Sequence, residues 1–224
     1  MALILNIETS TTNCSVSLSQ DEEILVLKED NNLGYSHAEK LHLFIREVIN
    51  ESGLSKNNLD AIAISKGPGS YTGLRIGVST AKGLCFSLDK PLISISTLEA
   101  LAHQVNVEEG CIVPVLDARR MEVYSAIFNS NYEQLREIKA EILDTASFSS
   151  QLEKNHVYFI GNGVEKTKTI INNRNAVFIN NKLPSASTMA SLSNNKYKKS
   201  DFEDVAYFEP YYLKDFVAIK SKKF

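Results

Sequence analysis

Cysteine is scarce in this chain, and the few cysteines stand far apart. The 224 residues include Cys14, Cys85 and Cys111, an odd number without close spacing. Disulfide frameworks need an even set of cysteines, and cysteine zinc sites need closely spaced pairs. The sequence therefore argues against both classes and favours a protein of a reducing compartment, which we expect to be the cytoplasm.

The chain also lacks a long apolar run. Its first segment, "MALILNIETS", holds an apolar stretch of only about five residues and has no basic leader. A membrane-spanning helix needs about 20 apolar residues. We therefore expect neither a signal peptide nor a membrane-spanning segment, and no membrane partner.

An excess of basic charge is missing as well. The net charge is −3, which argues against a protein that holds nucleic acid by charge alone. The charge is unevenly spread: residues 1–110 carry 8 basic and 14 acidic side chains, a net of −6, while residues 111–224 carry 16 and 13, a net of +3. We expect the two basic segments, residues 194–200 and 219–224, to be solvated.

Several motifs of catalysis are absent. The glycine-rich stretch "SKGPGSYTGLR" (residues 65–75) has neither the lysine of a P-loop nor the spacing of a dinucleotide fingerprint. No H-E-x-x-H zinc motif and no G-x-S-x-G nucleophile elbow occurs. His37 and His42 lie about 140° apart around a helix and cannot share a metal ion. The sequence predicts no metal site and no catalytic residue in this chain.

What the sequence does contain is a regular alternation of strand and helix patterns. A helix over residues 36–52 is indicated by its apolar spacing, with Ser36 and Glu39 as a capping box and Gly53 at its end. Strands are predicted over residues 2–8, 14–19, 23–29, 59–65 and 91–96, and a second helix over residues 72–88.

The second half repeats this order. Two copies of β-β-β-α-β-α-β give an α/β protein of two lobes with mixed sheets, the plan of actin, Hsp70 and sugar kinases (the ASKHA fold). We expect an N-terminal lobe over residues 1–104 and a C-terminal lobe over residues 105–224. The repeat consists of predicted strands 111–117, 122–128, 135–143 and 156–161, a weak helix 144–154 and a helix 163–172.

The glycine stretch has a structural explanation as a turn from strand to helix. Gly67 begins the turn, and Pro68 fixes its own φ angle. Gly69 can adopt a positive φ, and Thr72 is a candidate N-cap for the next helix. That helix carries a stripe of small residues beside an apolar stripe. One stripe packs on the chain's own sheet, and the other is free to pack on the same chain or on a second one. The stripes are Gly73, Gly77 and Ala81, and Leu74, Val78, Cys85 and Leu88.

One carboxylate ends the first strand of each predicted lobe. Glu8 and Asp117 are each followed by a short polar turn. In an ASKHA protein such turns hold nucleotide phosphates, so Glu8, Asp117 and the turn residues Thr9, Ser10 and Thr11 are candidates for nucleotide contact. The alternative is that they bond only to the backbone of their own turns.

Six segments carry a resemblance to a known family. In order along the chain, they resemble motifs of the bacterial TsaB (YeaZ, glycoprotease M22-like) family, and they are "ILNIETSTTNCSVSL", "SHAEKLHLFIREVI", "ISKGPGSYTGLRIGVSTAKGL", "ISTLEALA", "VLDARRMEVYSAIF" and "EPYYLKDFVA". The resemblance implies an ASKHA fold and a role in forming N6-threonylcarbamoyladenosine (t6A) at position 37 of tRNAs that read ANN codons.

The resemblance also implies how the work is divided. In the family, this subunit is a non-catalytic scaffold that pairs with its catalytic paralogue TsaD as a heterodimer, and the ATPase TsaE joins them. The histidine pair that binds metal in TsaD corresponds to Thr97 and Leu101 here, and Lys214 stands where the family usually has arginine. The partner surface is expected on helices 36–52 and 72–88, and we assign to it Leu41, Ile45, Val48, Gly73, Leu74, Gly77, Val78, Ala81 and Cys85.

Alternatives remain beside this hypothesis. The chain is expected to need no cofactor itself, although ATP or ADP can sit at the interface of the complex, and to meet tRNA only through the complex. Without its partner, it is expected to associate with a second copy. A stand-alone ATP-dependent enzyme of the ASKHA class, such as a small-molecule kinase, is the second hypothesis, and a protease is the least favoured.

Overall fold

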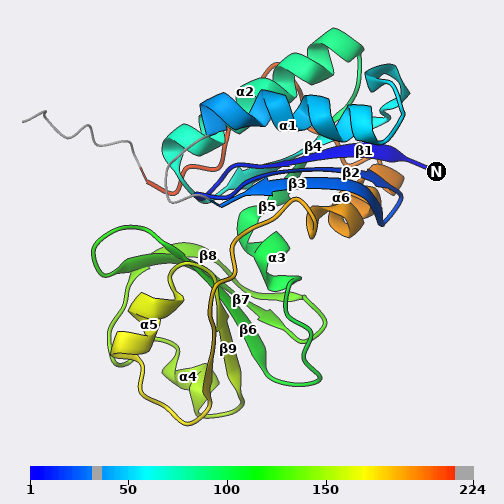
Figure 1. The fold of residues 1–224 in the computed structure, drawn as a ribbon. Helices are drawn as coiled ribbons and strands as arrows, with labels where there is room; N and C mark the ends of the chain where they lie inside the picture. The colour runs from blue at the N-terminus through cyan, green and yellow to red at the C-terminus, as the bar shows by residue number, and fades with distance from the viewer. Residues whose placement is uncertain (32–36, 215–224) are drawn as a thin grey trace, which may run out of the picture.

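The computed structural model describes residues 1–31 and 37–214, which form two five-stranded mixed sheets in two lobes (Figure 1). The strand order is β3-β2-β1-β4-β5 in the first sheet and β8-β7-β6-β9-β10 in the second. The two sheets thus repeat one topology, which confirms the predicted ASKHA class of α/β fold.

The first sheet combines an antiparallel meander with two parallel strands. The strand β1 is buried along its whole length because helices cover both faces of the sheet. Helices α1 and α2 lie side by side over one face (Figure 1), where Leu5, Leu41 and Val78 belong to one core. The elements are β1 (Leu3–Glu8), β2 (Cys14–Gln20), β3 (Glu23–Asp30), α1 (His37–Glu51), η1 (Lys56–Asn58), β4 (Ala61–Gly67), α2 (Tyr71–Leu88) and β5 (Leu92–Ser96).

The second sheet repeats this plan with shorter helices. Phe148, Leu152 and Val164 from the α4 and α5 region pack on its outer face around Phe159. The elements are β6 (Cys111–Asp117), β7 (Glu122–Asn129), β8 (Gln134–Ile142), α4 (Ser149–Leu152), β9 (Val157–Ile160), α5 (Val164–Ile170) and β10 (Ala176–Ile179).

A short helix, α3 (Thr97–Ala102), joins the two lobes and lies between their sheets (Figure 1). Ala100 packs into the core beneath the first sheet. Leu98 and Leu101 pack with Ile112 and Ile160 beneath the second. All three side chains are fully buried. The helix therefore contributes side chains to the hydrophobic cores of both lobes.

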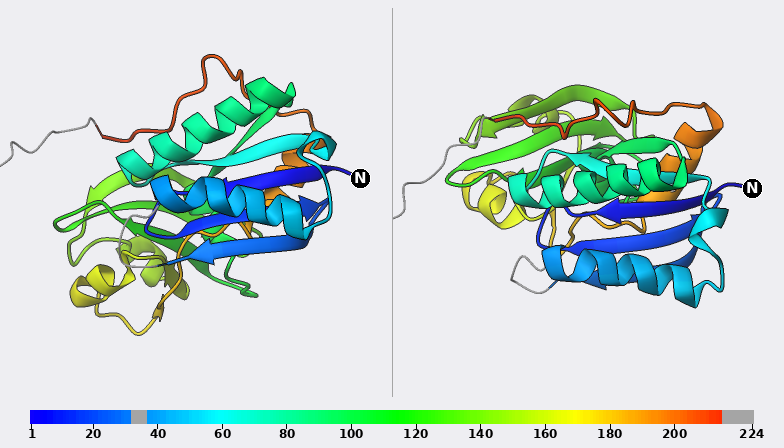
Figure 2. Two further views of the ribbon diagram at one scale, coloured as in Figure 1. Left: turned by 45° about the horizontal axis from the view of Figure 1, so that its top comes forward. Right: turned by 90° about the horizontal axis from the view of Figure 1, so that it is seen from above.

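The chain returns to the first lobe after β10. Helix α6 (Met189–Lys198) places Met189 in the core beneath β1 and β4. Residues 203–214, which we name the C-terminal strap, then run alongside α2 on the side away from α1 (Figure 2). Backbone bonds hold the strap, from Glu203 N–H to the Leu92 oxygen at 2.9 Å and from Tyr211 N–H to the Lys66 oxygen at 2.7 Å.

Because the chain returns, the first lobe also includes residues from beyond the expected lobe boundary at residue 104. The boundary falls between the two sheets, but α6 and the strap, both beyond residue 105, pack on the first sheet. The basic stretch 194–200, expected to be solvated, forms the end of α6, where Asn194 is buried. The second basic stretch, 219–224, lies outside the described residues.

Most predicted elements occur within two residues of their expected ends, but two details of the turn at α2 were wrong. The N-cap of α2 is Ser70, whose hydroxyl accepts the N–H of Gly73 at 3.3 Å, and Thr72 lies in the first helical turn. The positive φ belongs to Gly67, at 111°, and not to Gly69. Gly53 follows α1 with φ of 70°, as expected, while Ser36 of the predicted capping box lies outside the described residues.

No helix within residues 1–31 and 37–214 combines the length and the apolar character needed to cross a membrane.

The orientation of α1 can be tested by two leucines on opposite faces. Leu41 is fully buried and Leu43 is 38% exposed. We expect Leu41→Ala to lower the free energy of unfolding by about 2–5 kcal/mol, because it leaves a cavity, and Leu43→Ala to change it by less than about 0.5 kcal/mol. Urea denaturation measures both, and equal losses would contradict this orientation.

Candidate functional site

The glycine loop before α2 is filled by the chain's own first turn. Ser70 N–H donates to the Ser10 carbonyl oxygen at 2.7 Å, and Thr9 Oγ1 donates to the Gly73 oxygen at 2.9 Å. A Cβ atom at Gly69 would clash with the backbone of Ser10. The space in which a phosphate-binding loop would hold an anion is therefore occupied by the turn between β1 and β2.

The stripe of small residues on α2 allows the turn between β1 and β2 to pack closely against this helix. A Cβ at Gly73 would overlap the Thr9 carbonyl oxygen, and one at Gly77 would overlap Thr9 Oγ1. Ala81 is fully buried in the core of the first lobe. The close approach that this stripe permits is to the chain's own turn and not to a helix of another chain.

The other residues assigned to the partner surface also face inward, which corrects that assignment. All of them are buried, because the apolar stripe of each helix is the side that covers the sheet. They are Leu41, Ile45 and Val48 on α1 and Leu74, Val78 and Cys85 on α2.

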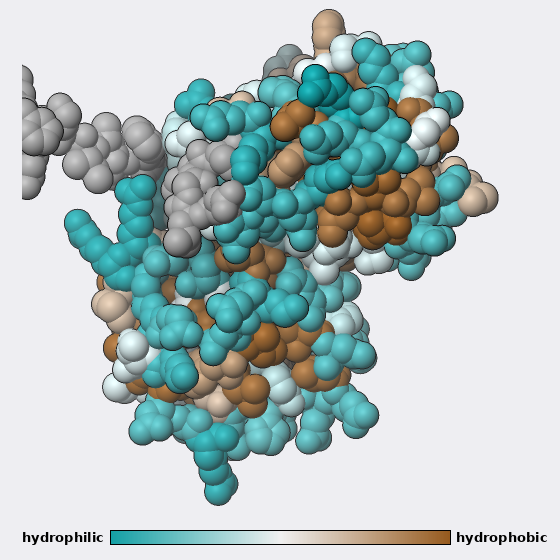
Figure 3. Space-filling model, viewed as in Figure 1, coloured by the Kyte–Doolittle hydropathy of each residue, from teal (hydrophilic) through white to brown (hydrophobic). Residues whose placement is uncertain are grey.

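The outer faces of the same two helices carry a different set of apolar side chains. Phe86 on α2 is 87% exposed, and Leu43 on α1 is 38% exposed. Phe44, Ile76 and Leu84 are partly buried and pack against the core of the first lobe. Phe86 is therefore exposed where most large apolar side chains of the two helices are covered. A separate hydrophobic patch lies over the edge strand β3 (Figure 3), where Leu25 and Leu27 are exposed.

Glu8, a predicted nucleotide contact, is enclosed. Its side chain is fully buried at the end of β1, and Oε1 accepts the N–H of Ser10 at 2.6 Å. Among the described residues, Oε2 has no hydrogen-bond partner. Burial raises the pKa of Glu8, and the bond from Ser10 only partly offsets this effect. Folding therefore shifts the equilibrium of this acid toward its protonated form.

The turn after Glu8 is buried as well. Thr9, Ser10 and Thr11 are each at most 5% exposed. His37 Nε2 donates to the Thr11 carbonyl oxygen at 2.7 Å, and burial lowers the pKa of this imidazole. In this conformation the three turn residues cannot meet a nucleotide, so their expected role as contacts is corrected to a structural one.

Asp117, the corresponding acid of the second lobe, stands in a different environment. It is exposed and pairs with Lys166 Nζ at 2.6 Å, while its Oδ1 also accepts the N–H of Arg119 at 2.7 Å. Within the described part of the chain, no hydrogen bond or ion pair links it to Glu8. The structure thus does not bring the two predicted carboxylates together as one site.

Thr97 and Leu101, which the resemblance aligned with a metal-binding histidine pair, are held in packed surroundings. Thr97 Oγ1 lies 2.7 Å from Ser65 Oγ, and Leu101 is in the core between the sheets. In residues 1–31 and 37–214, no group of three or more His, Cys, Asp or Glu side chains is placed to hold a metal ion.

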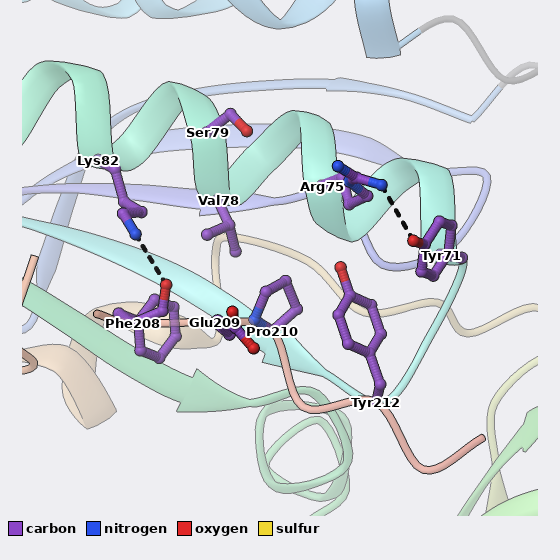
Figure 4. Close-up of a pocket in the computed structure, with 9 residues that line it drawn as sticks. All are labelled: Tyr71, Arg75, Val78, Ser79, Lys82, Phe208, Glu209, Pro210 and Tyr212. Atoms are coloured by element: carbon purple, nitrogen blue, oxygen red, sulfur yellow. Dashed lines mark hydrogen bonds between the residues drawn. The ribbon is translucent and has the colours of Figure 1, made fainter. Parts of the chain in front are cut away.

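A groove between α2 and the strap is the feature that the sequence did not indicate. It has a volume of 580 Å³, with Tyr71, Arg75 and Lys82 on one side and Pro210 and Tyr212 on the other (Figure 4). Lys82 Nζ donates to the carbonyl oxygens of Ala206 and Phe208 at 3.1 and 2.9 Å, which fixes the strap to the helix. The motif "EPYYLK" was evident in the sequence, but its place beside α2 was not.

Comparisons with known proteins agree with the fold and the motifs. The family model described as "TsaD: tRNA N6-adenosine threonylcarbamoyltransferase" matches residues 33–222. The chain is 31% identical to the tRNA threonylcarbamoyladenosine biosynthesis protein TsaB of Haemophilus influenzae, covering 97% of this chain and 95% of that protein. It is 28% identical to TsaB of Escherichia coli, covering 97% and 96%. It also resembles the crystal structure of YeaZ from Pseudomonas aeruginosa, with a TM-score of 0.82 at 25% identity over 95% and 100% of the chains.

Two glycines of α2 test the packing of the first turn. Gly73→Ala is expected to lower the free energy of unfolding by about 1–3 kcal/mol, because its Cβ meets backbone that must shift. Gly83 has open space around its Cβ position, so Gly83→Ala is expected to raise stability by about 0.5–1 kcal/mol. Thermal and chemical denaturation compare the two, and a stable Gly73→Ala variant would refute the packing.

The buried acid predicts a dependence on pH. Below the ordinary glutamate pKa of 4.5, Glu8 is protonated in both states of the chain. Above it, the unfolded chain releases the proton that the folded chain keeps, so this group makes the parent lose stability as the pH rises toward the folded pKa. Glu8→Gln removes the titration, and we expect the stability of the variant relative to the parent to grow with pH. Denaturation at a series of pH values measures this difference, and a constant difference would show that Glu8 does not hold its proton.

Proposed function

The chain belongs to the TsaB family, whose members act in the biosynthesis of tRNA threonylcarbamoyladenosine, and from this premise we propose that it is a non-catalytic scaffold that docks and activates a TsaD-type transferase. The role in t6A biosynthesis follows from the family. The division of labour is our proposal, and it includes TsaE as the ATPase that joins the pair, in the cytoplasm.

One observation carries the non-catalytic part of this proposal. The turn between β1 and β2 fills the glycine loop, with Ser70 N–H bonded to the Ser10 oxygen at 2.7 Å. Glu8, the acid that would hold a metal–nucleotide complex, is fully buried, and burial raises its pKa. A carboxylate that solvent cannot reach is poorly placed to bind a hydrated Mg²⁺ ion. We therefore propose that this chain needs no cofactor of its own, and that any nucleotide in the complex binds where the partner meets it.

The docking part is supported by the outer faces of α1 and α2. Leu43 and Phe86 are exposed there, at 38% and 87%. An exposed aromatic side chain is a common anchor of a protein interface. The same face offers a site for a second copy of the chain, so we expect self-association that the transferase displaces.

A stand-alone ATP-dependent enzyme is the alternative, and isothermal titration separates the two proposals. The scaffold hypothesis expects no heat of binding from ATP and magnesium with the chain alone. Binding at micromolar strength together with turnover of ATP by the chain alone would favour the enzyme.

Charged substitutions on the outer face test the docking proposal. We expect Phe86→Glu, and to a smaller extent Leu43→Glu, to weaken co-purification with the TsaD-type subunit by about tenfold or more, because each buries a charge at the interface. The same variants should reduce t6A formation in a mixture of tRNA, this chain, the TsaD-type subunit, TsaE and threonylcarbamoyl-adenylate, the donor of the threonylcarbamoyl group.

Ile142→Glu provides the matched control. Ile142 is 72% exposed on β8 of the second lobe and belongs to neither helix, and its variant should bind and support t6A formation as the parent does. If Phe86→Glu and Leu43→Glu behave like this control, the outer face of α1 and α2 is not the docking surface.

A further inference from the structure

The groove beside α2 joins aromatic and cationic side chains in one place. The rings of Tyr71 and Tyr212 lie 5.0 Å apart, and the Arg75 guanidinium carbon lies 5.4 Å from the centre of the Tyr71 ring. Arg75 Nη1 also donates to the Tyr71 hydroxyl at 3.0 Å. Tyr212 belongs to the strap, and its ring faces these two side chains of α2 (Figure 4). The volume of 580 Å³ is within the range of small-ligand sites.

The strap carries this surface across to the second lobe. Lys214, two residues after Tyr212, pairs with Glu122 of β7, and its Nζ lies 5.9 Å from the centre of the Tyr124 ring. The bond from Tyr211 N–H to the Lys66 oxygen holds the strap on the first lobe. One short segment therefore places a tyrosine against the first lobe and a lysine against a tyrosine of the second.

The turn between β6 and β7 adds two arginines, of which Arg119 is close enough to Tyr124 to act on its hydroxyl. Arg119 and Arg120 are exposed and have φ of 71° and 50°. The carboxylates of this turn are paired with lysines, Asp117 with Lys166 and Glu122 with Lys214. Among the described residues, neither arginine makes an ion pair. Their guanidinium groups are thus exposed and unpaired in a chain whose net charge is −3.

We propose that this surface, which we name the bridging surface, binds unpaired nucleotides of an RNA strand. It consists of Tyr71, Arg75, Tyr212, Lys214, Tyr124 and Arg119. Aromatic faces stack on exposed bases, and cations between them contact the phosphates, which is the common chemistry of single-stranded RNA recognition. Glu209 also lines the groove. Because a carboxylate repels phosphate, the base enters the groove and the phosphates lie toward Arg75, Lys214 and Arg119.

This proposal rests on the role of the chain in tRNA modification, which supplies an RNA with an unpaired loop. It goes beyond that role because it places part of the RNA on this chain and not only on the transferase. An acidic face of a partner protein is the competing occupant. Tyrosine and arginine are also common in protein interfaces. The role of the chain in tRNA modification is what favours RNA as the occupant, and the test separates stacking on a base from attraction between charges.

Fluorescence anisotropy of a labelled tRNA anticodon arm, titrated with the full chain at low salt, tests the proposal. We expect measurable binding, and about tenfold weaker binding by Tyr212→Ala, whereas Tyr212→Phe keeps the ring and binds as the parent does. Arg119→Ala/Arg120→Ala should weaken binding and lower the dependence of log K on log salt concentration by about one unit. The matched control Lys154→Ala/Arg174→Ala removes two exposed cations elsewhere on the second lobe and should bind as the parent does.

Two outcomes would overturn the proposal. The first is that the parent does not bind the arm, or binds a fully paired duplex equally well. The second is that all the charge variants, including the control, weaken binding equally while Tyr212→Ala does not.

Co-purification of the same variants keeps this proposal separate from the docking proposal. Phe86 lies roughly 16 Å along α2 from Arg75, so Phe86→Glu should lose the partner and keep the RNA, and Tyr212→Ala should do the reverse. Loss of the partner by Tyr212→Ala without a change in RNA affinity would assign the groove to a protein instead.

Discussion

The contact between the first turn and the start of α2 is the constraint on which the rest of the molecule depends. Thr9 and Ser10 bond to Gly73 and Ser70, so the end of β1 is fixed to the helix that covers the sheet. The contact needs glycine at positions 69, 73 and 77, because a Cβ at any of them would overlap the turn. It also encloses Glu8. The packing that satisfies these backbone groups is thus also what buries the predicted nucleotide contacts Glu8, Thr9, Ser10 and Thr11.

The regular elements could be predicted from sequence because their signals are local. Alternation, helical spacing and turn residues indicated nine of the ten strands and the long helices α1 and α2, and the repeated order indicated the two lobes. Four elements were not predicted, the short η1 and three others, for physical reasons. Helix α3 is only six residues long, β10 only four, and α6 has a polar sequence whose few buried residues find their partners on a sheet far away in the chain.

The candidate site was harder to predict because periodicity identifies a stripe but not what covers it. Gly73, Gly77 and Ala81 fit a neighbouring helix and a neighbouring turn equally well, and only the fold shows that Thr9 takes the space. Phe86 carried no such pattern, since it lies outside both stripes. The groove depended on a contact between α2 and residues more than a hundred positions later, and no local signal encodes it.

The return of the chain to its first lobe has a consequence for how the protein is made. One face of the first sheet is covered by Met189 and its neighbours on α6, and β5 receives the strap at Glu203. Both segments are synthesised after the strands of the second sheet. While the second lobe is being made, the first sheet therefore has one apolar face and one edge uncovered, although its strands are complete by residue 96. An uncovered apolar face and an unpaired strand edge favour aggregation until the later segments pack on them.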